Sequence, residues 1–185
     1  MMRKHPYEIL LDRKRKWSPV KPTVGDLKDE AKATIRRALA ARHMELPVGA
    51  FISEGLEKAV PENARKLLED NVKDEERHDL ALGWYTDALG ADENAEKEAL
   101  LLRDAWIQHP DHCITKALVA ERAIFFVLLP FFRFNGDAAL RTISADISRD
   151  EQIHVGSNSL VCRELGLRPS NSLDKLRKAT INWIM

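Results

Sequence analysis

Residues 74–78 read Asp-Glu-Glu-Arg-His, and residues 150–154 read Asp-Glu-Gln-Ile-His. Both follow the pattern Asp-Glu-x-x-His, in which a glutamate precedes a histidine by three residues. In an α-helix this spacing puts the two side chains on one face, one turn apart. One such pair arises easily by chance, so its meaning depends on what else repeats with it.

A single glutamate precedes each stretch by the same distance. Glu45 lies 30 residues before Glu75, and Glu121 lies 30 residues before Glu151. A pair of metal ions needs ligands from four directions, which two halves of this kind supply. The chain therefore repeats one layout twice, and this repeat is the strongest signal in the sequence.

Apolar residues recur at spacings of three and four along almost the whole chain, and no alternating run predicts a strand. We therefore expect an all-α fold with four long helices and additional short ones. Proline disturbs a helix interior, so we expect distortions at Pro47 and Pro130. The expected helices cover residues 25–60, 61–89, 94–108, 114–134 and 137–165, followed by one that Ser172 caps and that ends near Trp183.

The helix faces that carry the repeated residues are otherwise apolar. Steps of three and four from Glu75, Glu121 and Glu151 meet mainly leucine, isoleucine, valine and aromatic residues. Around Glu45 the same steps meet Ala38, Ala41, Val48, Gly49 and Ile52. A buried bare carboxylate is costly unless it is protonated, paired or bound to metal. Buried ion pairs with satisfied core histidines are the alternative interpretation.

We therefore predict a site for two metal ions. Glutamate oxygens with neutral imidazole suit iron or manganese, and no cysteine joins the set to make a thiolate zinc site. Iron is the first expectation, with manganese or a mixed pair as the other choices. The predicted ligands are Glu45, Glu75, His78, Glu121, Glu151 and His154.

These motifs resemble the ferritin-like superfamily of di-iron and di-manganese proteins, over residues 26–165. The resemblance implies a ferritin-like four-helix bundle in which Glu75 and Glu151 bridge the two metals. One metal would be bound by Glu45, Glu75 and His78, and the other by Glu121, Glu151 and His154. Asp74, Asp146 and Asp150 are candidates for orienting ligand histidines, and Tyr85 for a redox neighbour; solvated acids and a core tyrosine are the alternatives.

The resemblance also implies an enzyme, a di-metal oxidase or oxygenase that activates dioxygen to oxidise a small organic substrate. We also expect that an electron donor supplies the enzyme and that the protein forms a homodimer. Two alternatives stay open. One is a bacterioferritin-like protein that oxidises and stores iron, and the other is a shortened protein that resembles the ribonucleotide reductase small subunit. In that last family a radical tyrosine occupies the position of Leu82.

Residues 120–134 contain five phenylalanines on the helix that carries Glu121. They predict a bulky apolar wall suited to an apolar substrate, and the run looks like that of the aldehyde-deformylating oxygenases. The alternative is that these side chains form core and a subunit interface.

Composition bounds the remaining choices. The chain has 185 residues, and its 29 lysines and arginines balance 29 aspartates and glutamates, which argues against nucleic acid as the main partner. One domain, residues 23–185, follows a basic arm at residues 1–22 with a charge of about +5. We expect this arm to be solvated and partly disordered; docking on another subunit or an acidic partner is the alternative. Cys113 and Cys162 predict reduced thiols in a cytoplasmic protein, and no apolar stretch is long enough to span a membrane.

Overall fold

The computed structural model describes residues 4–185, which form helices and no strand. The all-α prediction is therefore confirmed. The elements are α1 (Pro6–Arg13), α2 (Asp29–Leu39), η1 (Ala40–Met44), α3 (Glu45–Glu57), α4 (Glu62–Leu89), α5 (Glu93–Gln108), α6 (Cys113–Ala123), η2 (Ile124–Leu128), α7 (Leu129–Asn135), α8 (Ala138–Glu164) and α9 (Asn171–Ile184).

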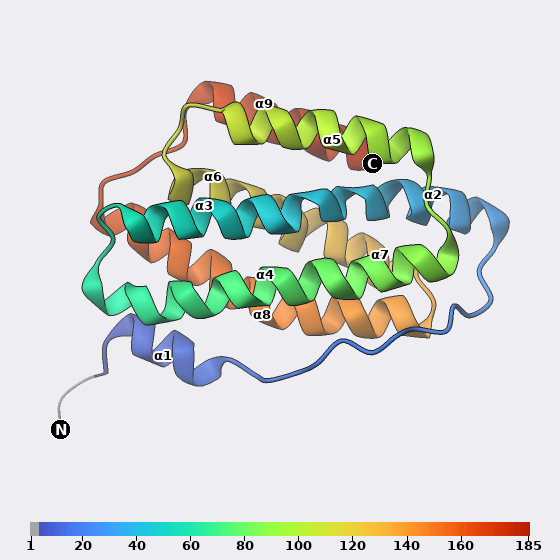
Figure 1. The fold of residues 1–185 in the computed structure, drawn as a ribbon, viewed down its shortest axis with the longest axis horizontal. Helices are drawn as coiled ribbons and strands as arrows, with labels where there is room; N and C mark the ends of the chain where they lie inside the picture. The colour runs from blue at the N-terminus through green and yellow to red at the C-terminus, as the bar shows by residue number, and fades with distance from the viewer. Residues whose placement is uncertain (1–3) are drawn as a thin grey trace.

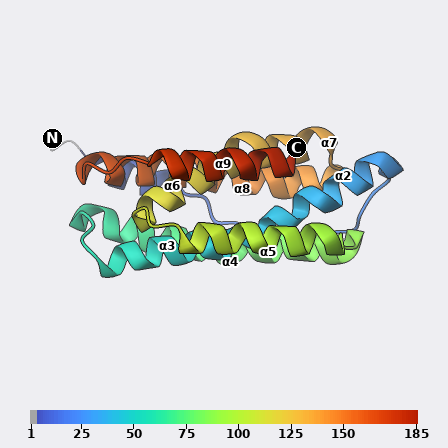
Figure 2. The ribbon, with the colours of Figure 1, turned by 90° about the horizontal axis from the view of Figure 1, so that it is seen from above.

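Four helical segments surround the core. α3 packs against both α4 and α6, and α8 packs against the same two helices from the other side. α5 and α9 lie together along one side of this arrangement, whereas α1 lies along the opposite side (Figure 1). Seen from above, α5 and α9 again run beside the long helices (Figure 2). The interior of the four segments is therefore closed on all sides by helices.

The first long helix begins later than expected, at Asp29, and is divided in two. A 3₁₀ segment, η1, separates α2 from α3, and Pro47 follows as the third residue of α3. The proline ring would clash with the carbonyl four residues earlier, at His43, so the distortion lies in the turn before Pro47. Glu45 is the first residue of the helix that follows.

The helix that carries Glu121 is also interrupted. A π-helical segment, η2, lies between α6 and α7, and Pro130 is the second residue of α7. As at Pro47, the irregular turn precedes the proline. The expected opening at Pro130 is therefore found in the turn before it.

Other helix ends differ by a few residues. Pro61 precedes α4 as its N-cap instead of beginning the helix, and Gly90 ends α4 with a φ of 88°, which glycine adopts without strain. The expected cap at Ser172 is wrong: the side chain of Ser170 accepts the hydrogen bond from Leu173 N and caps α9. Between residues 4 and 185, no helix combines the length and apolar character that a membrane span requires.

The basic arm differs most from expectation. Residues 6–13 form α1, which packs on α4 and α8, and Tyr7 is buried. The side chain of Lys14 is only 8% exposed. Tyr7, Lys14 and Trp17 of the arm therefore contact the long helices, which was not expected, whereas about half of the side chains in residues 4–22 are exposed. Residues 1–3 of the predicted arm lie outside the described residues.

Candidate metal centre

The structure brings the six predicted ligands together in the interior. Glu45 begins α3, Glu121 lies on α6, and the two Glu-x-x-His pairs lie on α4 and α8. Each of the six is at most 1% exposed. Gly49, one turn after Glu45, lets α3 approach α4 closely, because a Cβ there would lie 3.3 Å from the Cβ of Glu75.

One group of ligand atoms surrounds His78. Its Nδ1 lies 3.5 Å from Glu45 Oε2, 3.4 Å from Glu151 Oε1 and 3.8 Å from Glu75 Oε2. The ligand atoms of these four residues all lie within 4.8 Å of one another, a spacing that could hold one metal ion.

A second group surrounds His154. Its Nδ1 lies 2.9 Å from Glu75 Oε1 and 3.8 Å from Glu121 Oε1. Glu75, Glu121 and His154 form the second set that could hold a metal. Glu75 belongs to both groups and turns a different oxygen to each histidine, as a bridging ligand would. Glu151 was expected to bridge the metals from the His154 side, but it belongs only to the His78 group, although its Oε1 is 3.8 Å from His154 Nδ1.

Two aspartates hold the outer nitrogens of the histidines across helices. His154 Nε2 lies 2.9 Å from Asp74 Oδ2, and His78 Nε2 lies 3.2 Å from Asp150 Oδ2. A neutral histidine that donates from Nε2 presents a bare Nδ1 as a metal ligand. Both acids therefore lie where they could orient the two histidines as metal ligands.

The other two candidates do not contact this cluster. Asp146 pairs with Arg149 at 2.7 Å on the surface of α8. Tyr85 is buried, and its hydroxyl lies near Asp137 at the start of α8, an environment that raises its pKa through burial and the negative charge. Asp146 is thus a solvated acid and Tyr85 a core residue.

Four further side chains around the cluster were not predicted. Lys14 Nζ lies 2.5 Å from Asp74 Oδ2, and the indole N–H of Trp17 donates to Asp150 Oδ2 at 2.7 Å. Arg77 pairs with both aspartates. Asn158 donates to both oxygens of Glu121, at 2.9 and 2.8 Å. Two of them had a spacing in the sequence that could have indicated them: Asn158 lies one turn beyond His154, and Arg77 lies three residues after Asp74.

The charges separate into two layers. Asp74 and Asp150 are balanced by Lys14 and Arg77, whereas the four inner glutamates have only the two histidines beside them. Two divalent cations would neutralise the four carboxylates. The outer layer needs no further charge.

The inner atoms also lack hydrogen-bond partners. In the described part of the chain, sixteen buried side-chain nitrogen and oxygen atoms have no such partner, and half of them are in this cluster. They are both carboxylate oxygens of Glu45, Glu75 and Glu151 and the Nδ1 atoms of His78 and His154. Buried polar atoms are rarely left unpaired, so this concentration fits a site built for metal ions.

Without metal, protons take the place of that positive charge. Burial raises the pKa of Glu45 to about 8 and raises the pKa values of Glu121 and Glu151. For His154, burial lowers the pKa, but Asp74 and Glu75 outweigh this and raise it to about 10. At neutral pH the metal-free cluster therefore carries protons on groups that must lose them to bind metal.

Metal binding at pH 7 should consequently release protons, because the carboxyl of Glu45 has a pKa of about 8 and the nearby carboxylates raise the pKa values of both His78 and His154. Because binding needs the deprotonated forms, apparent affinity should rise with pH between 6 and 8. Addition of Mn²⁺ to the metal-free protein in weak buffer with a pH indicator measures the release. Binding with no release and no pH dependence would contradict this assignment of protons.

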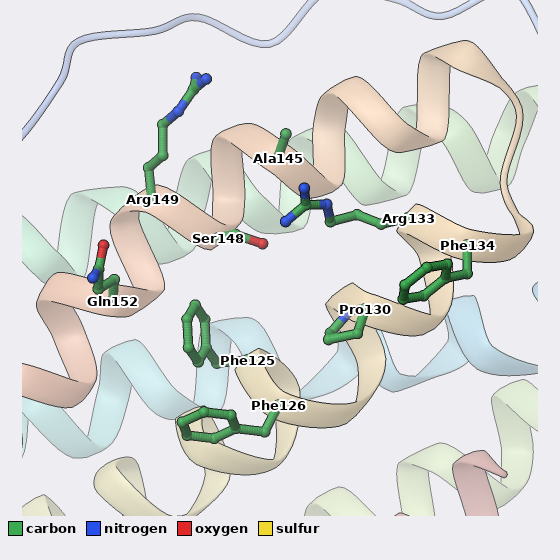
Figure 3. Close-up of a pocket in the computed structure, with 9 residues that line it drawn as sticks. All are labelled: Phe125, Phe126, Pro130, Arg133, Phe134, Ala145, Ser148, Arg149 and Gln152. Atoms are coloured by element: carbon green, nitrogen blue, oxygen red, sulfur yellow. The ribbon is translucent and has the colours of Figure 1, made fainter.

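A surface groove of about 660 Å³ lies between the η2–α7 segment and α8 (Figure 3). Phe125 and Phe126 form one wall, and Arg133 reaches across toward α8. The phenylalanine run is divided, because Phe132 is fully buried whereas Phe134 is 86% exposed. The run therefore contributes both to the core and to this groove.

No family model, curated protein or solved structure matches this chain.

Proposed function

We propose that this protein is a ferritin-like dinuclear metal enzyme that activates dioxygen to oxidise a small organic substrate. The observation that carries the proposal is the set of unpaired carboxylate oxygens and imidazole nitrogens that converge in the buried cluster. Bare charges of this number are not stable in a protein interior unless cations or protons compensate them.

Iron and manganese both suit the donor set. The cluster offers oxygen and imidazole nitrogen, the donors that these metals accept, and none of its members is a cysteine. Glu45, Glu75, His78 and Glu151 would hold one ion, and Glu75, Glu121 and His154 the other. Such a metal pair, when bound, would supply the redox chemistry and the coordination positions for dioxygen.

The chain itself would hold and isolate this pair. Asp74 and Asp150 fix the histidine tautomers, and Asn158 holds Glu121 in place. The six ligands are shielded from solvent, which keeps competing water out.

The groove supports an apolar substrate. Its wall residue Phe125 lies one turn beyond Glu121, and its lining residue Gln152 directly follows Glu151. The groove, between η2–α7 and α8, therefore adjoins the chain segments that carry Glu121 and Glu151. A substrate with an apolar body would contact the phenylalanines there.

Anaerobic loading with Fe²⁺ followed by exposure to dioxygen tests the proposal. We expect about two iron ions per chain, and repeated dioxygen consumption only when a reductant and a suitable substrate are present. A panel of straight-chain alcohols, aldehydes and carboxylic acids gives the first substrate screen. Uptake of many iron ions per chain in a large assembly would instead support iron storage and contradict an oxygenase.

A further inference from the structure

The N-terminal segment, residues 4–28, crosses the outer side of the candidate metal centre. α1 packs on α4 and α8, and the chain then runs along these helices before α2 begins (Figure 1). Residues 14–28 contain no helix. This part is therefore held to the protein mainly by its side chains. We call residues 4–28 the strap.

Lys14 fixes the strap above one histidine. Its ammonium lies 2.5 Å from Asp74 Oδ2 and donates to Asn71 Oδ1 at 2.9 Å. Asp74 in turn holds His154. The burial of this lysine and its contacts with Asp74 make it part of the wall around the cluster.

Trp17 fixes the strap above the other histidine. Its indole N–H donates to Asp150, which holds His78, and its ring stacks on the His78 ring at 6.2 Å between centroids and 15° between planes. The guanidinium carbon of Arg77 lies over the indole ring of Trp17, 5.4 Å from the ring centroid. Trp17 therefore closes the outer side of His78.

Leu10 anchors the strap at a distance from these acids. Both of its methyl groups would lie 3.5 Å from a Cβ at Gly156, an ordinary packing distance, so Leu10 packs on α8 at this residue. Leu10 is half-buried and is not a member of either ligand group. A change at Leu10 can thus loosen the strap without altering the ligand set.

We propose that the strap is the gate of the metal centre, and that metal ions enter and leave when it detaches. The inference rests on the proposed metal site. Every ligand is at most 1% exposed, so some part of the protein must open for exchange. The long helices α4 and α8 share the core, whereas the strap has one short helix and is attached through side chains such as Tyr7, Lys14 and Trp17. Its local opening therefore costs less than separating the helices.

Leu10→Ala should speed metal exchange in both directions. We expect release of Fe²⁺ to excess ferrozine, measured anaerobically, to become roughly tenfold faster because truncating a packed leucine favours the open strap. Uptake of Fe²⁺ should accelerate by a similar factor, so the equilibrium dissociation constant should stay nearly unchanged. Leu10→Val should give the same pattern with a smaller change.

Leu176→Ala is the matched control, because Leu176 is also half-buried but lies on α9, on the side of the molecule opposite α1 (Figure 1). Its exchange rates should equal those of the wild type. Equal rates in Leu10→Ala and Leu176→Ala would overturn the gate while leaving the metal site intact. Faster release without faster uptake would also overturn it, because that result means weakened ligands. Failure of the wild type to bind Fe²⁺ would remove both proposals.

Discussion

Replacing Glu75 with glutamine is expected to abolish binding of both metal ions. Glu75 is the only residue in both ligand groups, and it turns one oxygen toward each histidine. Glutamine keeps the size of the side chain but removes its negative charge and replaces one oxygen with a nitrogen that cannot bind metal. Elemental analysis after anaerobic loading and gel filtration should find about two metals in the wild type and almost none in Glu75→Gln.

Two variants make this result specific. Glu121→Gln should still bind one metal, because Glu121 belongs only to the His154 group. Glu76→Gln should bind two, because Glu76 neighbours Glu75 in sequence but is exposed on α4. Two metals retained by Glu75→Gln, or equal losses in all three variants, would contradict the arrangement of the site.

The next largest effect is expected from Asp150→Asn. Asp150 accepts a hydrogen bond from the Nε2–H of His78, which leaves the Nδ1 atom without a proton on the side of the glutamates. An asparagine can donate its own N–H to Nε2, which favours the tautomer with a proton on Nδ1 and blocks the ligand position. We expect affinity at this metal position to fall by about 10- to 100-fold, as is usual when the partner of a ligand histidine is lost.

Competition titration against a chelator of known affinity measures that loss. Asp146→Asn is the matched control, because Asp146 lies one turn earlier on α8 and pairs with Arg149 at the surface. It should bind metal like the wild type. An equal effect of the two substitutions would mean that Asp150 acts through general charge and not through His78.

The central residues were predictable because their signal is periodic. The 30-residue spacing repeated, each Glu-x-x-His pair lay on one helical face, and the neighbouring positions were apolar. These three properties place the side chains of Glu45 and Glu121 in the same interior as the pairs. Asp74 and Asp150 could be named for the same reason, since each adjoins a ligand glutamate in the sequence.

The arm was not predictable by this reasoning. Lys14 stands among consecutive basic residues, a pattern typical of a solvated terminus, and its contact with Asp74 joins residues 60 positions apart. Trp17 and Asp150 are separated by 133 positions. No helical periodicity links such residues. Only the packing of α1 on α4 and α8 brings them together.

The sequence indicated that two helices are interrupted, but it did not indicate the exact positions of the interruptions. Proline indicated both distortions, yet a ring that excludes a backbone donor acts on the preceding turn, so η1 and η2 precede Pro47 and Pro130. The cap of α9 depended on which of two nearby serines turns its hydroxyl to the helix. Sequence alone does not distinguish Ser170 from Ser172.

Anomalous X-ray scattering from crystals of the manganese-loaded protein tests the metal site most directly. We expect two peaks about 3.5–4 Å apart, the separation found in two-metal sites. They should lie among Glu45, Glu75, His78, Glu121, Glu151 and His154, with Glu75 contacting both. No peak in this interior, or peaks only at surface acids, would contradict the central claim.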